Sequence, residues 1–178
     1  MSLAPPSLHG LVKVKELSNT NLIPTLSASA SLPQGRDITV TCQSYADRLL
    51  VSVTQYGKMG CLIQAQTHIG SSYAEPVPWQ DDAPSSAPLQ PTVSLVPLFG
   101  TPPPELQDVY SLYATHIATR ISQDLIGPSA DLPSQSRLKP IIVALALERS
   151  PTKEEWDMST ERVRLDQVMQ LLAQCRVW

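Results

Sequence analysis

The chain has 178 residues, of which 42% are hydrophobic, and carries a formal net charge of −3. This length and composition fit one globular domain, spanning residues 1–178, with a sizeable core. Because Lys and Arg are scattered along an acidic chain, we do not expect it to bind nucleic acid through a basic stripe. The longest apolar run, residues 141–147, is far shorter than the ~20 residues that span a membrane. The N-terminus has no basic start and no apolar segment typical of a secretory signal.

The cysteines indicate a reducing compartment. Cys42, Cys61 and Cys175 are odd in number and widely spaced, which disfavours both a disulfide framework and a zinc site. We therefore expect free thiols, a protein of the cytoplasm with the nucleus as the alternative, and no metal or cofactor.

Proline-rich and polar segments divide the chain. Residues 1–20 are predicted to be a flexible N-terminus, with a short edge strand near residues 11–17 as an option. Residues 71–91 and 127–138 are rich in Pro, Ser and Asp and lack any period. They are predicted to be loop insertions.

Alternating apolar residues predict strands in the first half of the chain. Ile38, Val40 and Cys42 alternate with threonines, which is typical of a half-buried strand. The same period predicts strands over residues 48–55 and 61–66, and a further strand over 26–32 that pairs before them. The short links favour an antiparallel meander.

The second half of the chain alternates strands and helices. A strand is predicted over residues 93–99, where Pro97 requires an edge or a bulge because proline donates no hydrogen bond to the ladder. A helix then opens at the prolines of 102–104, with one apolar stripe made of Leu106, Tyr110, Tyr113, Ile117 and Ile121.

Residues 141–147 are apolar on both faces and predict a central strand. Residues 161–175 predict a last helix, capped by Ser159 or Thr160. The order is a strand meander followed by β-α-β-α. This order predicts the α+β class: an antiparallel sheet with both helices packed on one face, as a two-layer sandwich.

The sequence offers no recognisable catalytic constellation. His9, His68 and His116 lie far apart, and neither a nucleophile elbow nor a phosphate-binding loop is present. Asp81 and Asp82 are adjacent but fall in a Pro/Ser-rich segment, where they favour solvation of a loop. We therefore predict no enzymatic activity, although side chains distant in sequence can still assemble a site in space.

Gly57-Lys58-Met59-Gly60 is the most distinctive short motif. It matches the G-x-x-G loop of KH-type RNA-binding domains, but that loop joins two helices, whereas both flanks here predict strands. We expect Gly57 and Gly60 to supply positive φ in a turn. Tyr56, Lys58 and Met59 would then protrude as partner contacts.

The C-terminus ends on Trp178, directly after the last predicted helix. Chain ends usually fray unless they are held by contacts. A terminal tryptophan therefore predicts docking, either onto the chain's own sheet or onto a partner, and we include Trp178 among the candidate partner-binding residues.

Residues 49–60, Leu-Leu-Val-Ser-Val-Thr-Gln-Tyr-Gly-Lys-Met-Gly, resemble the segment typical of the proteasome assembly chaperone 3 family. The ending Cys-Arg-Val-Trp is similar to that family's Cys-x-Val-Trp. The resemblance covers about residues 26–70, 92–123 and 139–178, and the segments between them are longer than in compact members.

The resemblance implies a chaperone without cofactor or catalysis. It implies a heterodimer with a structurally similar partner, the fourth assembly chaperone, that binds α-type subunits of the 20S proteasome. The pair would promote α-ring formation and leave before maturation. The alternative is a small interaction adaptor of another complex, because fold does not determine function.

Overall fold

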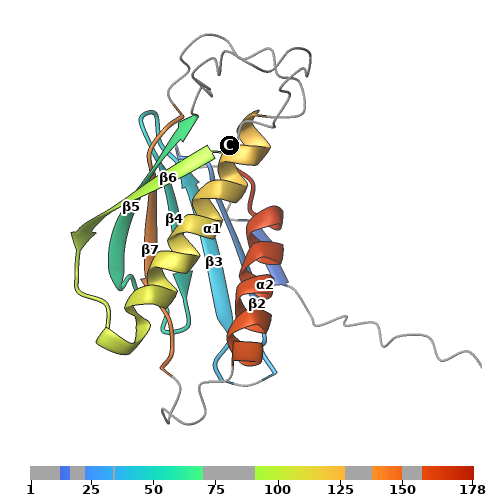
Figure 1. Cartoon of the computed structure of the whole chain (residues 1–178). Helices are drawn as coiled ribbons and strands as arrows, with labels where there is room; N and C mark the ends of the chain where they lie inside the picture. The colour runs from blue at the N-terminus through green and yellow to red at the C-terminus, as the bar shows by residue number, and fades with distance from the viewer. Residues whose placement is uncertain (1–12, 17–22, 34, 70–90, 127–137, 150–157) are drawn as a thin grey trace, which may run out of the picture.

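The computed structural model describes residues 13–16, 23–33, 35–69, 91–126, 138–149 and 158–178. Within them, a single mixed sheet carries two long helices on one face (Figure 1). The predicted α+β class with two layers is confirmed. The strands are β1 (Lys13–Glu16), β2 (Thr25–Ala30), β3 (Ile38–Ser44), β4 (Leu49–Thr54), β5 (Cys61–Ile69), β6 (Pro91–Phe99) and β7 (Ile141–Ala146). The helices are the short η1 (Pro104–Leu106), α1 (Gln107–Ile126) and α2 (Met158–Gln174).

The strand order is β1-β2-β3-β4-β7-β5-β6. All neighbours are antiparallel except β4 and β7, which are parallel. The prediction of a wholly antiparallel sheet is therefore wrong for this pair. The meander continues only to β4, because β7 lies between β4 and β5. The crossover through α1 returns the chain to the middle of the sheet, where a strand that is apolar on both faces is buried best.

The core lies between the sheet and the helices. The inward residues of β3 and β4 are fully buried, as their alternation predicts. The whole predicted stripe of the first helix is also buried, namely Leu106, Tyr110, Tyr113, Ile117 and Ile121. Helix α1 packs over β5, β6 and β7, whereas α2 packs over β2 and β3.

Helix α2 begins earlier than the sequence pattern predicts. It starts at Met158, so Ser159 and Thr160 lie inside it and neither is its cap. Its inward face includes Val168, Leu172 and the following Cys175, all fully buried.

The predicted loops lie mostly outside the described residues. Within the predicted flexible N-terminus, 1–20, residues 13–16 form the edge strand β1, and the other residues lie outside the described part of the chain. Of the insertions at 71–91 and 127–138, only Pro91, which begins β6, and Leu138 are described. Pro97 lies on an edge strand beside a register shift, as predicted.

All three cysteines are buried free thiols. Neither helix in the described ranges is both long enough and apolar enough to cross a membrane.

Candidate protein-binding surface

Residues 55–60, here called the 55–60 turn, connect β4 to β5 across the end of β7. Gly60 passes so close to β7 that a Cβ there would lie 2.1 Å from the carbonyl oxygen of Leu145. Gly57 adopts φ 65°, as predicted, with open space around it. The predicted positive φ is wrong for Gly60, where glycine is needed because the backbone of β7 leaves no room for a side chain.

Gln55 anchors the turn from inside. Its side chain, only 7% exposed, donates from Nε2 to the carbonyl oxygen of Arg36 at 3.1 Å. Its Oε1 accepts from the backbone N–H of Glu148 at 2.9 Å and from Nη1 of Arg164 at 3.2 Å. One buried amide thereby ties together the β2–β3 link, the end of β7 and helix α2.

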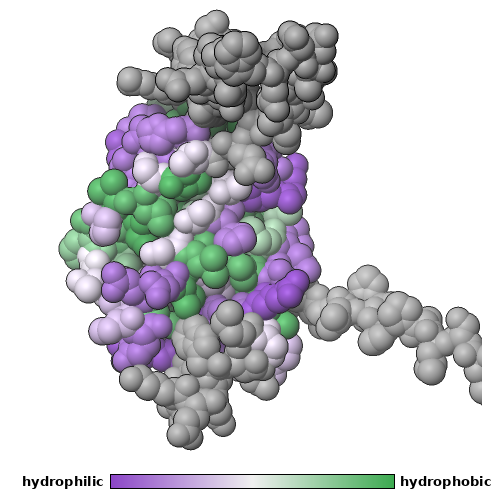
Figure 2. All heavy atoms as spheres, viewed as in Figure 1, coloured by the Kyte–Doolittle hydropathy of each residue, from purple (hydrophilic) through white to green (hydrophobic). Residues whose placement is uncertain are grey.

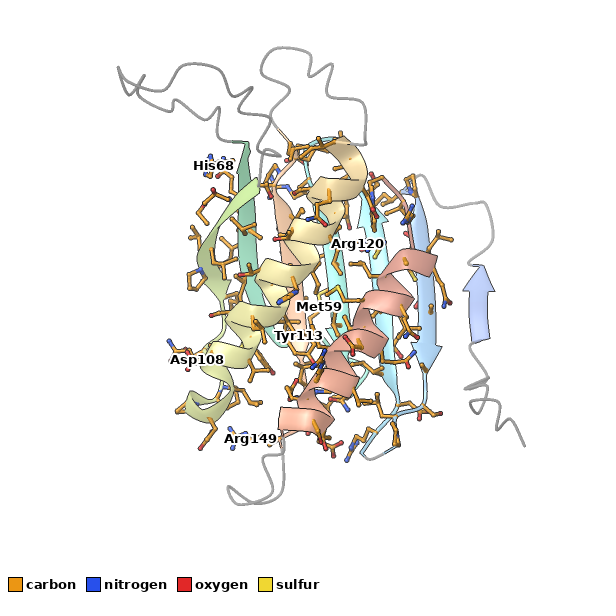
Figure 3. All side chains as sticks on the ribbon, turned by 45° about the vertical axis from the view of Figure 1, so that its right-hand side comes forward. Met59, His68, Asp108, Tyr113, Arg120 and Arg149 are labelled. Carbon is orange, nitrogen blue, oxygen red and sulfur yellow. The ribbon has the colours of Figure 1, made fainter. Side chains whose placement is uncertain are left out.

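Arg164 extends this anchor between the helices. It is ion-paired with Glu161, donates to the hydroxyl of Tyr113 at 3.3 Å and to the carbonyl oxygen of Glu148 at 3.0 Å. The Tyr113 hydroxyl donates to Glu161 at 2.6 Å, and Tyr113 lies between α1 and α2 (Figure 3). Burial raises the pKa of Tyr113 well above its ordinary value, so the hydroxyl stays a donor at neutral pH.

The outer side of the turn is exposed. Tyr56 is 41% and Met59 56% exposed. The Thr54 hydroxyl accepts from the backbone N–H groups of Tyr56 and Lys58, at 3.1 and 3.3 Å, which shapes the start of the turn. The guanidinium of Arg36 lies 5.0 Å from the centre of the Tyr56 ring, and the Lys58 ammonium lies 5.8 Å from it. The predicted contact residues Tyr56, Lys58 and Met59 are therefore together and exposed.

The face of the sheet opposite the helices is not covered by any described element (Figure 1). Over β2 and β3 this open face carries hydroxyl pairs. Ser27 bonds Thr41 at 2.8 Å, and Ser29 bonds Thr39 at 2.9 Å. Because each pair already forms one hydrogen bond, covering these hydroxyls costs less than covering free ones.

Over β4, β7, β5 and β6 the open face becomes apolar. Leu50, Ile142, Gln64 and Val96 follow one another across the four strands. The next such row consists of Ser52, Ala144, Leu62 and Phe99. We call the apolar members that are exposed or half-buried the open-face patch: Leu50, Leu62, Val96, Phe99 and Ile142.

The patch reaches the edge of the sheet at β6. Val96, Leu98 and Phe99 are 50%, 48% and 70% exposed, and β6 contains no charged residue. In Figure 2, seen from the helix side, hydrophobic side chains gather over β6 and the neighbouring part of α1. An uncharged apolar edge of this kind is typical of a surface that meets another protein.

The C-terminus lies apart from the 55–60 turn. Trp178 and Val177 are half-buried against the core. Arg176 is held by Asp124 of α1 at 3.2 Å. Arg164 contacts the anchor of the turn, but α2 rises about 15 Å from there to its end. The structure thus shows the predicted docking of Trp178 onto its own fold, and its role in partner binding stays a prediction.

Sequence reasoning missed the residues that hold the turn and part of the patch. Gln55 belonged to the segment that carries the resemblance, but its anchoring partners Glu148 and Arg164 are about a hundred residues away. Arg36 had no pattern to mark it. Phe99 could have been found, because β6 lacks any charge whereas β1, the other edge, is Lys-Val-Lys-Glu.

The candidate metal-binding and catalytic side chains are not brought together in the described parts of the chain. These parts hold no group of three or more His, Cys, Asp or Glu residues that could bind a metal ion. His68 and His116 are exposed on β5 and α1, and His9, Asp81 and Asp82 lie outside the described residues. Gly57 and Gly60 are flanked by strands on both sides, unlike the helices of a KH loop.

No family model and no curated protein matches the sequence. A solved structure does match: a chain in a novel chaperone complex for yeast 20S proteasome assembly is similar to this one with a TM-score of 0.51. The match covers 83% of this chain and 98% of that chain, at 12% sequence identity. The chain therefore shares the fold of a protein from a proteasome assembly chaperone complex.

Proposed function

We propose that this chain is a proteasome assembly chaperone that acts as one half of a heterodimer. It pairs with a structurally similar chaperone, binds α-type subunits, promotes α-ring formation of the 20S core particle and leaves before maturation. The single observation that carries the proposal is the fold match to a yeast 20S assembly chaperone complex over 98% of that chain. The resemblance of residues 49–60 to the proteasome assembly chaperone 3 family supports it independently.

The open face of the sheet is the surface we assign to the sister chaperone. Two sheets can pack face to face when apolar side chains meet and the polar groups are satisfied. The open-face patch, apart from Phe99 at its β6 end, supplies the apolar side chains, and the hydroxyls of β2 and β3 already form hydrogen bonds with each other.

The proposed role requires no catalysed reaction, because such a chaperone works by orienting subunits. Three free buried thiols suit a reducing compartment, and we place the protein in the cytoplasm.

The test is affinity purification of the tagged chain from its own cells, with mass spectrometry of the proteins that accompany it. We expect α-type subunits and a second small chaperone, without mature β-type subunits. A stable set of partners without proteasome subunits would contradict the proposal and favour an interaction adaptor.

A matched pair of variants locates the sister interface. Ile142→Glu introduces a charge at the centre of the open-face patch, and we expect it to lose the second chaperone. Val163→Glu places the same charge on an exposed position of α2, 47% exposed, and should keep it. If both variants retain the second chaperone, the open face is not the heterodimer interface. Circular dichroism checks that Ile142→Glu is folded.

A further inference from the structure

The 55–60 turn combines a rigid base with an exposed tip. Buried Gln55 holds three backbone or side-chain partners, and the Thr54 hydroxyl accepts two N–H groups of the turn. A tip that is fixed before binding loses less entropy when a partner arrives.

The tip carries two cations beside one aromatic ring. Arg36 and Lys58 lie within 6 Å of the centre of Tyr56. Arg36 uses its Nε and backbone N–H for Glu148, at 3.3 and 3.0 Å. Its terminal Nη atoms form no hydrogen bond with any described residue, and the Lys58 ammonium forms no ion pair with one. These donors are free to bind a carboxylate.

Two exposed apolar side chains lie in the 55–60 turn and at the strand end next to it. Met59, in the same turn, is 56% exposed, and Phe99 at the end of β6 is 70% exposed. A Cβ on Gly100 would lie 3.6 Å from the carbonyl oxygen of Gly60, so the end of β6 and the end of the turn are adjacent. The surface is therefore mixed, with cationic donors next to apolar groups.

We propose that Arg36, Tyr56, Lys58, Met59 and Phe99 form a binding surface for an acidic protein segment that carries a large apolar side chain next to a carboxylate. Lys58 and the free end of Arg36 would receive the carboxylate over the Tyr56 ring. Met59 and Phe99 would cover the apolar side chain. Glu148 and the net charge of −3 disfavour a nucleic acid, whose phosphates need more cations than this corner offers. The inference stands on the turn itself, whichever complex the chain serves.

The probe is the blocked peptide Gly-Glu-Leu-Glu-Phe-Gly, titrated into the ¹⁵N-labelled full chain and followed by NMR. We expect shifts at the amides of residues 35–36, 56–60 and 99–100, with a dissociation constant below about 1 mM. The neutral peptide Gly-Gln-Leu-Gln-Phe-Gly should bind about fivefold more weakly. Raising the salt from about 50 to 300 mM should reduce this difference.

Two matched variants give the control. Lys58→Gln should weaken the acidic peptide about fivefold, to the level of the neutral one. Lys139→Gln removes an exposed lysine just before β7, at the end of that strand away from the 55–60 turn. This variant should bind the acidic peptide as the unchanged chain does.

Equal binding of the two peptides, shifts confined to other residues, or no shifts at millimolar peptide would each overturn the proposal. So would a uridine oligonucleotide that shifts the same amides at lower concentration. Co-purification of proteasome subunits tests the chaperone role separately, so either proposal can fail alone.

Discussion

The 55–60 turn and the C-terminus were both predicted to contact partners, but the structure treats them differently. The turn has a buried anchor, Gln55, and displays Tyr56 and Met59 to solvent. At the C-terminus the large side chain itself, Trp178, is half-buried against the core. The aromatic side chain in the turn is therefore available to a partner, whereas the one at the C-terminus packs against the chain's own core.

The difference indicates how to separate folding from binding in this chain. Where buried groups hold an exposed tip, changes of the anchor should affect stability, and changes of the tip should affect binding. Where the aromatic is itself packed, its loss should reduce stability first. Three substitutions test this comparison.

Gly60→Ala should have the largest effect, a loss of about 3 kcal/mol or more in the free energy of unfolding. Its Cβ would lie 2.1 Å from the Leu145 carbonyl oxygen, so the turn or β7 must move. Gly57→Ala is the matched control. It meets open space and should cost only the left-handed backbone strain, about 1–2 kcal/mol. Urea unfolding of both variants measures the difference, and equal losses would show that the contact with β7 is unimportant.

Gln55→Ala should cost about 2 kcal/mol, because it leaves the Glu148 N–H and the Arg36 carbonyl without their partner. The half-buried Gln43 provides the control, because among the described residues its side chain bonds the side chains of Thr25 and Tyr45 and no backbone group. Gln43→Ala should cost well under half as much. Thermal unfolding compares them, and a Gln55 variant as stable as the control would mean that the buried amide does not hold the turn.

Trp178→Ala should cost about 1 kcal/mol, since only part of the indole leaves water on folding. Partner binding, measured well below the melting temperature, should be unchanged if Trp178 serves its own fold. Loss of the second chaperone or of α-type subunits without loss of stability would instead support the predicted partner-binding role.

Local pattern was sufficient for most elements of the fold. Every residue of the predicted alternation Ile38, Val40 and Cys42 is buried, and so is the predicted stripe of α1. Periodicity predicts this because the direction of each side chain depends on the local backbone. The position of Tyr56, Lys58 and Met59 on a protruding turn was predictable for the same reason. No pattern in the sequence marked Arg36. The register of β3 and β4, which pairs Thr39 with Thr54, brings it beside Tyr56 once the strands end.

The sequence by itself determined which segments form strands and helices, which of their faces are apolar, and that Gly57 needs a left-handed backbone. Only the tertiary structure decided that β7 enters between β4 and β5 and that it lies parallel to β4. It also decided that residue 60 must be glycine, because the chain there passes against the backbone of β7. Hydrophobic periodicity predicts which face of a single segment packs against the core. The neighbour of each strand depends on contacts between residues far apart in the chain, such as Gln55 with Glu148 and Arg164.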